Sequence, residues 1–155
     1  MEARMKNPAY VLPDALPALM AVGRIVTRPG GLPGITLGLV TLRASQINGC
    51  GFCVDMHGRE LKNLGETDER LFAVAAWRES PYFDDSERVA LELSEAMTRL
   101  SDRSDAVPDA LWERAAQQFD EQKLAQLILA ISTVNMWNRM NVATRQIAGS
   151  IKVNH

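Results

Sequence analysis

Apolar residues recur along most of this chain at spacings of three and four, and no stretch shows sustained alternation of apolar and polar positions. The first pattern is typical of amphipathic helices, whereas the second would indicate half-buried strands. Clusters of proline and glycine, such as the one at residues 29–34, separate the periodic segments. The predicted helices run from Asp14 to Val26, Ile35 to Ile47, Cys50 to Leu64, Thr67 to Trp77, Asp84 to Leu100, Pro108 to Phe119, and from Asp120 onward.

Capping residues support these boundaries. Thr67 and Asp84 are good N-caps, and Glu87, three residues after Asp84, completes the pattern of a capping box. Gly65 is a C-terminal signal for the preceding helix. The sequence therefore predicts an all-α fold, a bundle of about seven helices, with residues 1–155 forming a single domain.

Composition and charge narrow the function classes. Nearly half of the 155 residues are apolar, about a quarter are charged, and the net charge is −2. A nucleic-acid partner is not expected, because such proteins normally carry a clustered basic excess. Polar residues interrupt every apolar stretch well before about 18 residues, so we expect no membrane-spanning segment. The N-terminal segment has no apolar core of a signal peptide, and we expect a cytoplasmic protein.

The candidate chemistry lies in a Cys-x-x-Cys pair that is followed four residues later by a histidine. On a helix, Cys53 lies about 60° from Cys50 around the axis, and His57 lies within about 20° of Cys50 after two turns. Free N–H groups in the first turn of a helix favour a thiolate, and an adjacent imidazole can take or return a proton. The spacing thus permits a nucleophilic thiol, a resolving thiol and a proton relay.

The same residues have two other interpretations. They could be two inert core cysteines with a buried histidine, or three ligands of a zinc site. Zinc normally needs a fourth protein ligand or a water, the only other histidine is His155, and no third cysteine exists. We therefore favour a redox dithiol and expect no metal. A thioredoxin would need a βαβ pattern, and a nicotinamide cofactor would need a glycine-rich fingerprint; neither pattern is present.

Several segments resemble the AhpD-like branch of the carboxymuconolactone decarboxylase superfamily. The similarity runs from about Leu39 to Val142 and is most specific between Arg43 and His57. The segments that carry it are LRASQINGCGFCVDMHGRELKNLGETDERL, AAWRES, ERVALELSEAMT and VNMWNRM. The resemblance implies an AhpD-like helical bundle that assembles into a homo-oligomer, either a trimer or a hexamer made as a trimer of dimers.

The resemblance also implies a thiol-dependent peroxidase. Cys53 would attack a small hydroperoxide and become a sulfenic acid. Cys50 would donate a proton and then resolve the sulfenic acid as a Cys50–Cys53 disulfide. His57 would belong to the proton relay, and an unidentified thiol reductant would reopen the disulfide. Decarboxylation is not expected, because the decarboxylases of the superfamily generally lack this dithiol.

One position departs from the family pattern. The peroxidases of the family usually carry a glutamate twelve residues before the first cysteine, and here that position is Gly38. No Asp or Glu occurs between Asp14 and Asp55. Asp55 would face away from His57, whereas Glu60, three residues after His57, shares its face and is the possible relay carboxylate. The alternative functions are dithiol–disulfide exchange and non-enzymatic redox sensing by an oligomer. Gly38 could also simply permit close helix packing.

A few other polar residues are candidates for contacts near the thiols. Arg24, Arg28 and Arg43 are the only charged residues from position 15 to position 54, and an arginine close to the dithiol would favour the thiolate. Asn135 and Asn138 on the last helix are possible hydrogen-bonding residues near the site.

Overall fold

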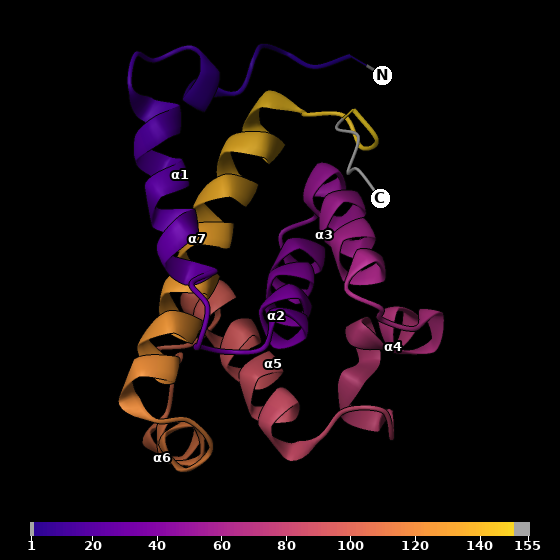
Figure 1. Cartoon of the computed structure of the whole chain (residues 1–155), viewed down its shortest axis with the longest axis vertical. Coiled ribbons are helices and arrows are strands. Elements are labelled where there is room, and N and C mark those ends of the chain that lie inside the picture. Colours follow the sequence, from indigo (N-terminus) through magenta and orange to yellow (C-terminus); the bar gives the residue numbers. More distant parts are fainter. Residues whose placement is uncertain (1, 151–155) are drawn as a thin grey trace.

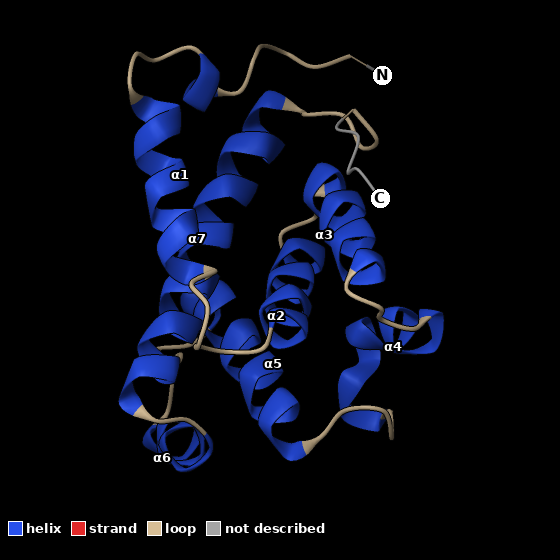
Figure 2. Cartoon of the chain, viewed as in Figure 1, coloured by secondary structure: helices blue, strands red, loops and turns tan. Residues whose placement is uncertain are grey.

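The computed structural model describes residues 2–150, and the polypeptide in this range folds into helices joined by short loops (Figures 1 and 2). This confirms the predicted all-α fold. Within the described residues there is no strand, and no helix is both long enough and apolar enough to cross a membrane. The α-helices are α1 (Ala15–Val26), α2 (Gly34–Ile47), α3 (Gly51–Asn63), α4 (Asp68–Ala73), α5 (Asp85–Thr98), α6 (Asp109–Gln118) and α7 (Glu121–Thr144), and the 3₁₀ helices are η1 (Pro8–Tyr10), η2 (Val74–Glu79) and η3 (Leu100–Asp102).

Helix α2 lies at the centre of the bundle and packs against α3, α5 and α7 (Figure 1). Leu37 and Val40 of α2 join one apolar cluster, with side chains of α5, α6 and α7. Leu39 and Leu42 join a second cluster, with side chains of α3, η2 and α5. Because α2 is covered on more than one side, its sequence is apolar almost all round and shows no single polar face.

The predicted caps are confirmed. The hydroxyl of Thr67 accepts a hydrogen bond from the N–H of Arg70 at 3.4 Å. Asp84 accepts from the N–H of Glu87 at 2.9 Å, and the Glu87 carboxylate accepts from the N–H of Asp84 at 3.1 Å, which completes the capping box. These contacts satisfy N–H groups that have no partner inside the helix, so the helix starts can be derived from the sequence alone.

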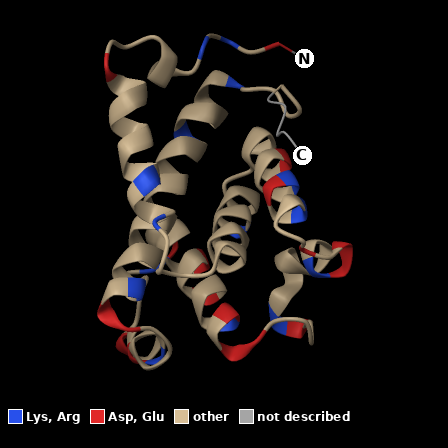
Figure 3. Ribbon diagram, viewed as in Figure 1, with Lys and Arg blue, Asp and Glu red and all other residues tan. Residues whose placement is uncertain are grey.

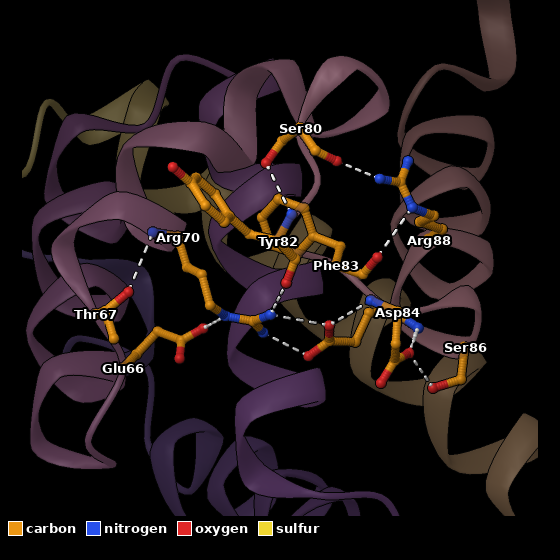
Figure 4. Close-up of polar contacts among 10 residues, drawn as sticks. Glu66, Thr67, Arg70, Ser80, Tyr82, Phe83, Asp84, Ser86 and Arg88 are labelled. Carbon is orange, nitrogen blue, oxygen red and sulfur yellow. Dashed lines mark hydrogen bonds and ion pairs between the residues drawn. The ribbon is translucent and has the colours of Figure 1, made fainter.

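The helix predicted from Thr67 to Trp77 is the main error in the sequence-based boundaries. The α-helix ends at the close of α4, and the chain continues as the tighter η2, with non-helical dihedral angles at Ala76. Trp77 is buried, and the guanidinium group of Arg88 on α5 binds backbone carbonyls across this turn (Figure 4). The carbonyls that it binds belong to Trp77 and Arg78 in η2 and to Ser80 and Phe83 after it, so an arginine of the next helix stabilises the end of this segment.

Helix α1 is rich in apolar residues but buries little of its surface. It packs against α7 and η1, and Val26 is its one residue in the buried class. Met20 and Ile25 are 48% and 61% exposed, and few charged residues interrupt this side of the fold (Figure 3). An uncovered apolar surface of this kind is typical of contact regions between proteins. It is compatible with the homo-oligomer implied by the family resemblance, which stays a prediction.

Candidate functional site

The two cysteines lie at the start of α3, directly after a sharp turn that ends α2. Gly49 forms this turn with a φ of +65°, a left-handed conformation that favours glycine. Cys50 is the N-cap residue of α3, and its sulfur accepts a hydrogen bond from the N–H of Cys53 at 3.3 Å. Cys50 and Cys53 form a disulfide, with their Cα atoms 5.3 Å apart. Both side chains are almost fully buried, at 2% and 1% exposure.

His57 lies one helical turn after Cys53 and pairs with Glu60. Its Nδ1 atom is 2.8 Å from the Oε2 atom of Glu60, and the imidazole is largely buried whereas the carboxylate is half exposed. When Nδ1 donates to this carboxylate, the lone pair of the neutral ring lies on Nε2, which can then exchange a proton. Asp55 instead binds Arg59 and the N–H of Gly149. The structure thus brings the predicted carboxylate, and not Asp55, to the imidazole.

Gly38 acts as a packing residue between α2 and α3. A Cβ atom at this position would lie 2.5 Å from Cδ2 and 2.8 Å from Cγ of Leu61. Leu61 is fully buried in the second apolar cluster, so it has little room to move aside. The position at which the related peroxidases carry a glutamate is therefore filled here by the close approach of a leucine from α3.

Helix α7 contributes three buried asparagines, spaced three residues apart and facing α2 and α3. Asn135 and Asn138 each accept a hydrogen bond at 2.9 Å from the side-chain amide of Asn48, which follows α2. Asn141 donates from Nδ2 to the sulfur of Cys53 at 3.2 Å. The two asparagines suspected from the sequence hold α7 against the end of α2, while the next one in the series contacts the sulfur. The spacing of these asparagines marks Asn141 as a member of the same series, but nothing in the sequence shows which of the three reaches the sulfur.

None of the three arginines between positions 15 and 54 makes a contact with the thiols in the part of the chain that the structure describes. Arg24 and Arg28 are exposed. Arg43 binds the buried carboxylate of Glu95 at 2.6 Å, as does Arg78 at 2.5 Å, and the indole N–H of Trp77 donates to Glu95 at 3.1 Å. Burial raises the pKa of Glu95, but the hydrogen bonds from Arg78, Arg43 and Trp77 outweigh this effect and hold the pKa below its ordinary value.

A second ion cluster stabilises the region between α4 and α5 (Figure 4). The guanidinium group of Arg70 binds the carboxylates of Glu66 and Glu87 and the backbone carbonyl of Tyr82. It also lies 4.9 Å from the centre of the Phe83 ring. The hydrogen bond to Glu87 is the main cause that raises the pKa of Arg70 above its ordinary value. None of these contacts involves Cys50 or Cys53, so the cluster stabilises the scaffold.

Among the described residues, the dithiol belongs neither to a cluster of metal-ligating side chains nor to the lining of the cavity between α5 and α6. Among residues 2–150, no group of three or more His, Cys, Asp or Glu side chains is arranged to hold a metal ion. A cavity of about 400 Å³ lies between α5, α6 and η3, and its lining includes Arg78, Arg99, Arg103 and Arg114 but neither cysteine nor His57. The chemistry that this site can support is therefore that of two sulfurs, an imidazole, a carboxylate and neutral amides.

Comparison with known proteins agrees with this architecture. The sequence model of the carboxymuconolactone decarboxylase family matches residues 13–96. The uncharacterized protein YdfG of Bacillus subtilis is 35% identical over 140 residues, which is 90% of this chain and 93% of YdfG. The alkyl hydroperoxide reductase AhpD of Methylocella silvestris is 38% identical over 63 residues, 41% of this chain and 33% of AhpD.

The fold is also shared with a crystal structure. ATU0492 from Agrobacterium tumefaciens, a protein of unknown function described as a candidate antioxidant defence protein AhpD, superposes with a TM-score of 0.88. The two sequences are 33% identical, and the match covers 97% of this chain and 100% of that one.

Proposed function

Because the chain belongs to the carboxymuconolactone decarboxylase family, in its AhpD-like branch, we propose that it is a thiol-dependent peroxidase that reduces small hydroperoxides. The observation that carries this proposal is the buried Cys50–Cys53 pair at the start of α3, one turn before an imidazole bound to a carboxylate. Two sulfurs that can cycle between dithiol and disulfide supply the two electrons that reduction of a hydroperoxide requires.

The proposed cycle begins in the reduced protein. His57 takes the proton of Cys53, and the thiolate attacks one oxygen of the hydroperoxide. A sulfur–oxygen bond forms as the oxygen–oxygen bond breaks, so Cys53 becomes a sulfenic acid. The alkoxide that leaves takes the proton of Cys50 and departs as an alcohol. A proton donor within reach is needed at this step because an alkoxide is a poor leaving group.

The second half of the cycle closes the disulfide. The thiolate of Cys50 attacks the sulfur of Cys53, a sulfur–sulfur bond forms, and hydroxide leaves and takes the proton held by His57 to become water. A dithiol reductant then supplies two electrons and two protons by thiol–disulfide exchange and restores both thiols. In this cycle Glu60 orients the imidazole through Nδ1, so that Nε2 carries the proton.

Stopped-flow kinetics with pre-reduced protein and cumene hydroperoxide test the proposal. We expect a fast reaction in the wild type and accumulation of the Cys50–Cys53 disulfide. Cys53→Ser should abolish the reaction. Cys50→Ser should stop it at the sulfenic acid, which a dimedone mass adduct detects. His57→Asn should slow peroxide consumption by about 10²-fold, a typical loss for a missing proton-transfer residue.

Two results would contradict the peroxidase proposal. One is a wild-type rate no faster than that of a free thiol, and the other is a rate that Cys53→Ser leaves unchanged. In the first case, measurement of disulfide exchange with a small dithiol would test the alternative function, because exchange needs the same two sulfurs but no peroxide.

A further inference from the structure

The side-chain amide of Asn141 is the polar group that the structure brings to the sulfur of Cys53 from outside α3. Its Nδ2 atom is 3.2 Å from Sγ, and both residues are buried, at 6% and 1% exposure. Asn135 and Asn138 lie on the same side of α7 but bind Asn48 and, in the case of Asn138, the hydroxyl of Ser45. Asn141 therefore differs from its two neighbours in binding a reacting atom.

Asn7 fixes which end of this amide faces the sulfur. Its Nδ2 atom donates to Oδ1 of Asn141 at 2.7 Å, and its own Oδ1 accepts from the N–H of Ala9 at 2.9 Å. Since Oδ1 of Asn141 is occupied by a donor, Nδ2 must point toward Cys53. Asn7 is itself buried, and nearby backbone contacts hold its segment to the end of α7, as Arg4 donates its N–H to the carbonyl of Thr144.

We propose that Asn141 is a catalytic residue that stabilises the anionic sulfur of Cys53 through an amide N–H, and that Asn7 is the positioning residue that orients this amide. A disulfide sulfur is a weak acceptor, whereas a thiolate is charged and forms a much stronger hydrogen bond. The contact should therefore favour the anion over both the neutral thiol and the disulfide. The role in turnover rests on the proposed peroxidase function, but stabilisation of the anion can be measured without peroxide.

The charged side chains around the site have other partners or face solvent. Asp55 of α3 pairs with Arg59, Arg43 of α2 pairs with Glu95, and Arg4 donates to the carbonyl of Ala143. His57 of α3 follows Cys53 by four residues and pairs with Glu60. Lys6, Arg139 and Arg145, which lie on or beside the end of α7 or in the N-terminal segment, are exposed. With these groups occupied or solvated, a neutral amide is the donor left to act on the Cys53 sulfur.

The test measures Cys53 alone, in full-length protein that carries Cys50→Ser, by pH titration of the ultraviolet absorbance of the thiolate. We expect Asn141→Ala to move the titration midpoint upward by about one pH unit, a tenfold loss of thiolate at a fixed pH below the midpoint. Asn141→Asp should move it further, because a carboxylate repels the anion. Asn7→Asp retains the acceptor for the N–H of Ala9 but removes the donor to Oδ1 of Asn141. The Asn141 amide can then rotate its Nδ2 away from the sulfur, so the midpoint should also rise.

Asn138→Ala is the matched control, because it removes a buried amide one turn earlier on α7 that does not contact sulfur. It should lower the free energy of unfolding and leave the titration midpoint unchanged. The proposal is overturned when Asn141→Ala titrates like its parent, or when Asn138→Ala shifts the midpoint equally. If circular dichroism shows that Asn141→Ala is unfolded, the titration midpoint of Asn7→Asp becomes the test. A raised midpoint then supports the proposal, and an unchanged midpoint overturns it. A shifted midpoint in a protein that does not consume peroxide would reject the peroxidase function and leave this role of Asn141 intact.

Discussion

Two of the regions in which the chain buries polar side chains are built in different ways. Around Glu95, a carboxylate is surrounded by cations: Arg43 and Arg78 bind it directly, and Arg99 lies 3.7 Å away. Around the dithiol, the buried partners are neutral amides, and the sulfur of Cys53 is bound by Asn141. Buried ion pairs thus stabilise the scaffold of this fold, whereas amide dipoles lie at the redox pair.

The two regions meet on α2. Arg43 extends toward Glu95 on α5, whereas Ser45, two residues later, accepts from the amide of Asn138 on α7. Positions two apart on a helix face different directions, so one helix can contribute to both networks. A fixed charge near the thiols would favour one ionisation state at all times. An amide can bind a disulfide, a thiol or a thiolate, and gains most when the sulfur is charged.

The largest expected effect comes from breaking the ion region with Glu95→Gln. This change leaves three arginines without their carboxylate, and loss of one partner from a buried ion network typically costs about 3 kcal/mol of unfolding free energy. Urea denaturation measures this loss. The titration midpoint of Cys53 should stay at its wild-type value, because Glu95 does not contact the sulfurs. A shift of that midpoint would show that the two regions are not independent.

The effect of Glu95→Gln on the free energy of unfolding should depend on pH. The folded pKa of Glu95 is below its usual value of 4.5, so its ionised form stabilises the fold at pH above that value. This contribution is lost as the pH falls through the folded pKa, when the carboxyl group becomes protonated. The difference in unfolding free energy between wild type and Glu95→Gln should therefore be constant near neutral pH and shrink below about pH 4.5.

A smaller effect is expected from Gly38→Ala, which tests how closely α3 must pack against α2. The new Cβ would overlap Leu61, and overpacking a core typically costs about 1–3 kcal/mol, against a gain of about 1 kcal/mol in helix propensity. We expect a net loss of about 1 kcal/mol by urea denaturation. Gly58→Ala is the matched control, because nothing lies within 4 Å of its Cβ position, and it should stabilise the protein. Equal gains for both variants would contradict the packing role of Gly38.

The helices and the dithiol could be predicted from the sequence because their causes are local. The capping box of Asp84 and Glu87 involves residues three apart, and Cys50, Cys53 and His57 lie within two turns of one helix. The all-α assignment rested on periodicity that each segment carries by itself. These features depend on neighbours in the chain, which a sequence displays directly.

The features that could not be predicted depend on residues far apart in the chain. Arg88 of α5 binds backbone carbonyls at the end of η2, and Leu61 of α3 fills the space beside Gly38. The contact of Asn141 with Cys53 joins residues 88 positions apart, and no periodicity within one helix could reveal it. Tertiary contacts of this kind decide which of several similar asparagines reaches the sulfur.

The smallest expected effect concerns Glu60, whose carboxylate contacts the imidazole of His57. Glu60→Gln retains an acceptor for Nδ1 of His57 but removes the charge, and the side chain is half exposed, so water screens much of the interaction. We expect peroxide consumption to slow by roughly threefold, in line with the modest energy of exposed ion pairs. Asp55→Asn is the control, because the carboxylate of Asp55 lies on the same helix but binds Arg59 and not His57. A slower rate in both variants would assign the effect to the overall charge of α3 and not to the contact with His57. An unchanged rate in Glu60→Gln would show that Glu60 takes no part in the proton relay.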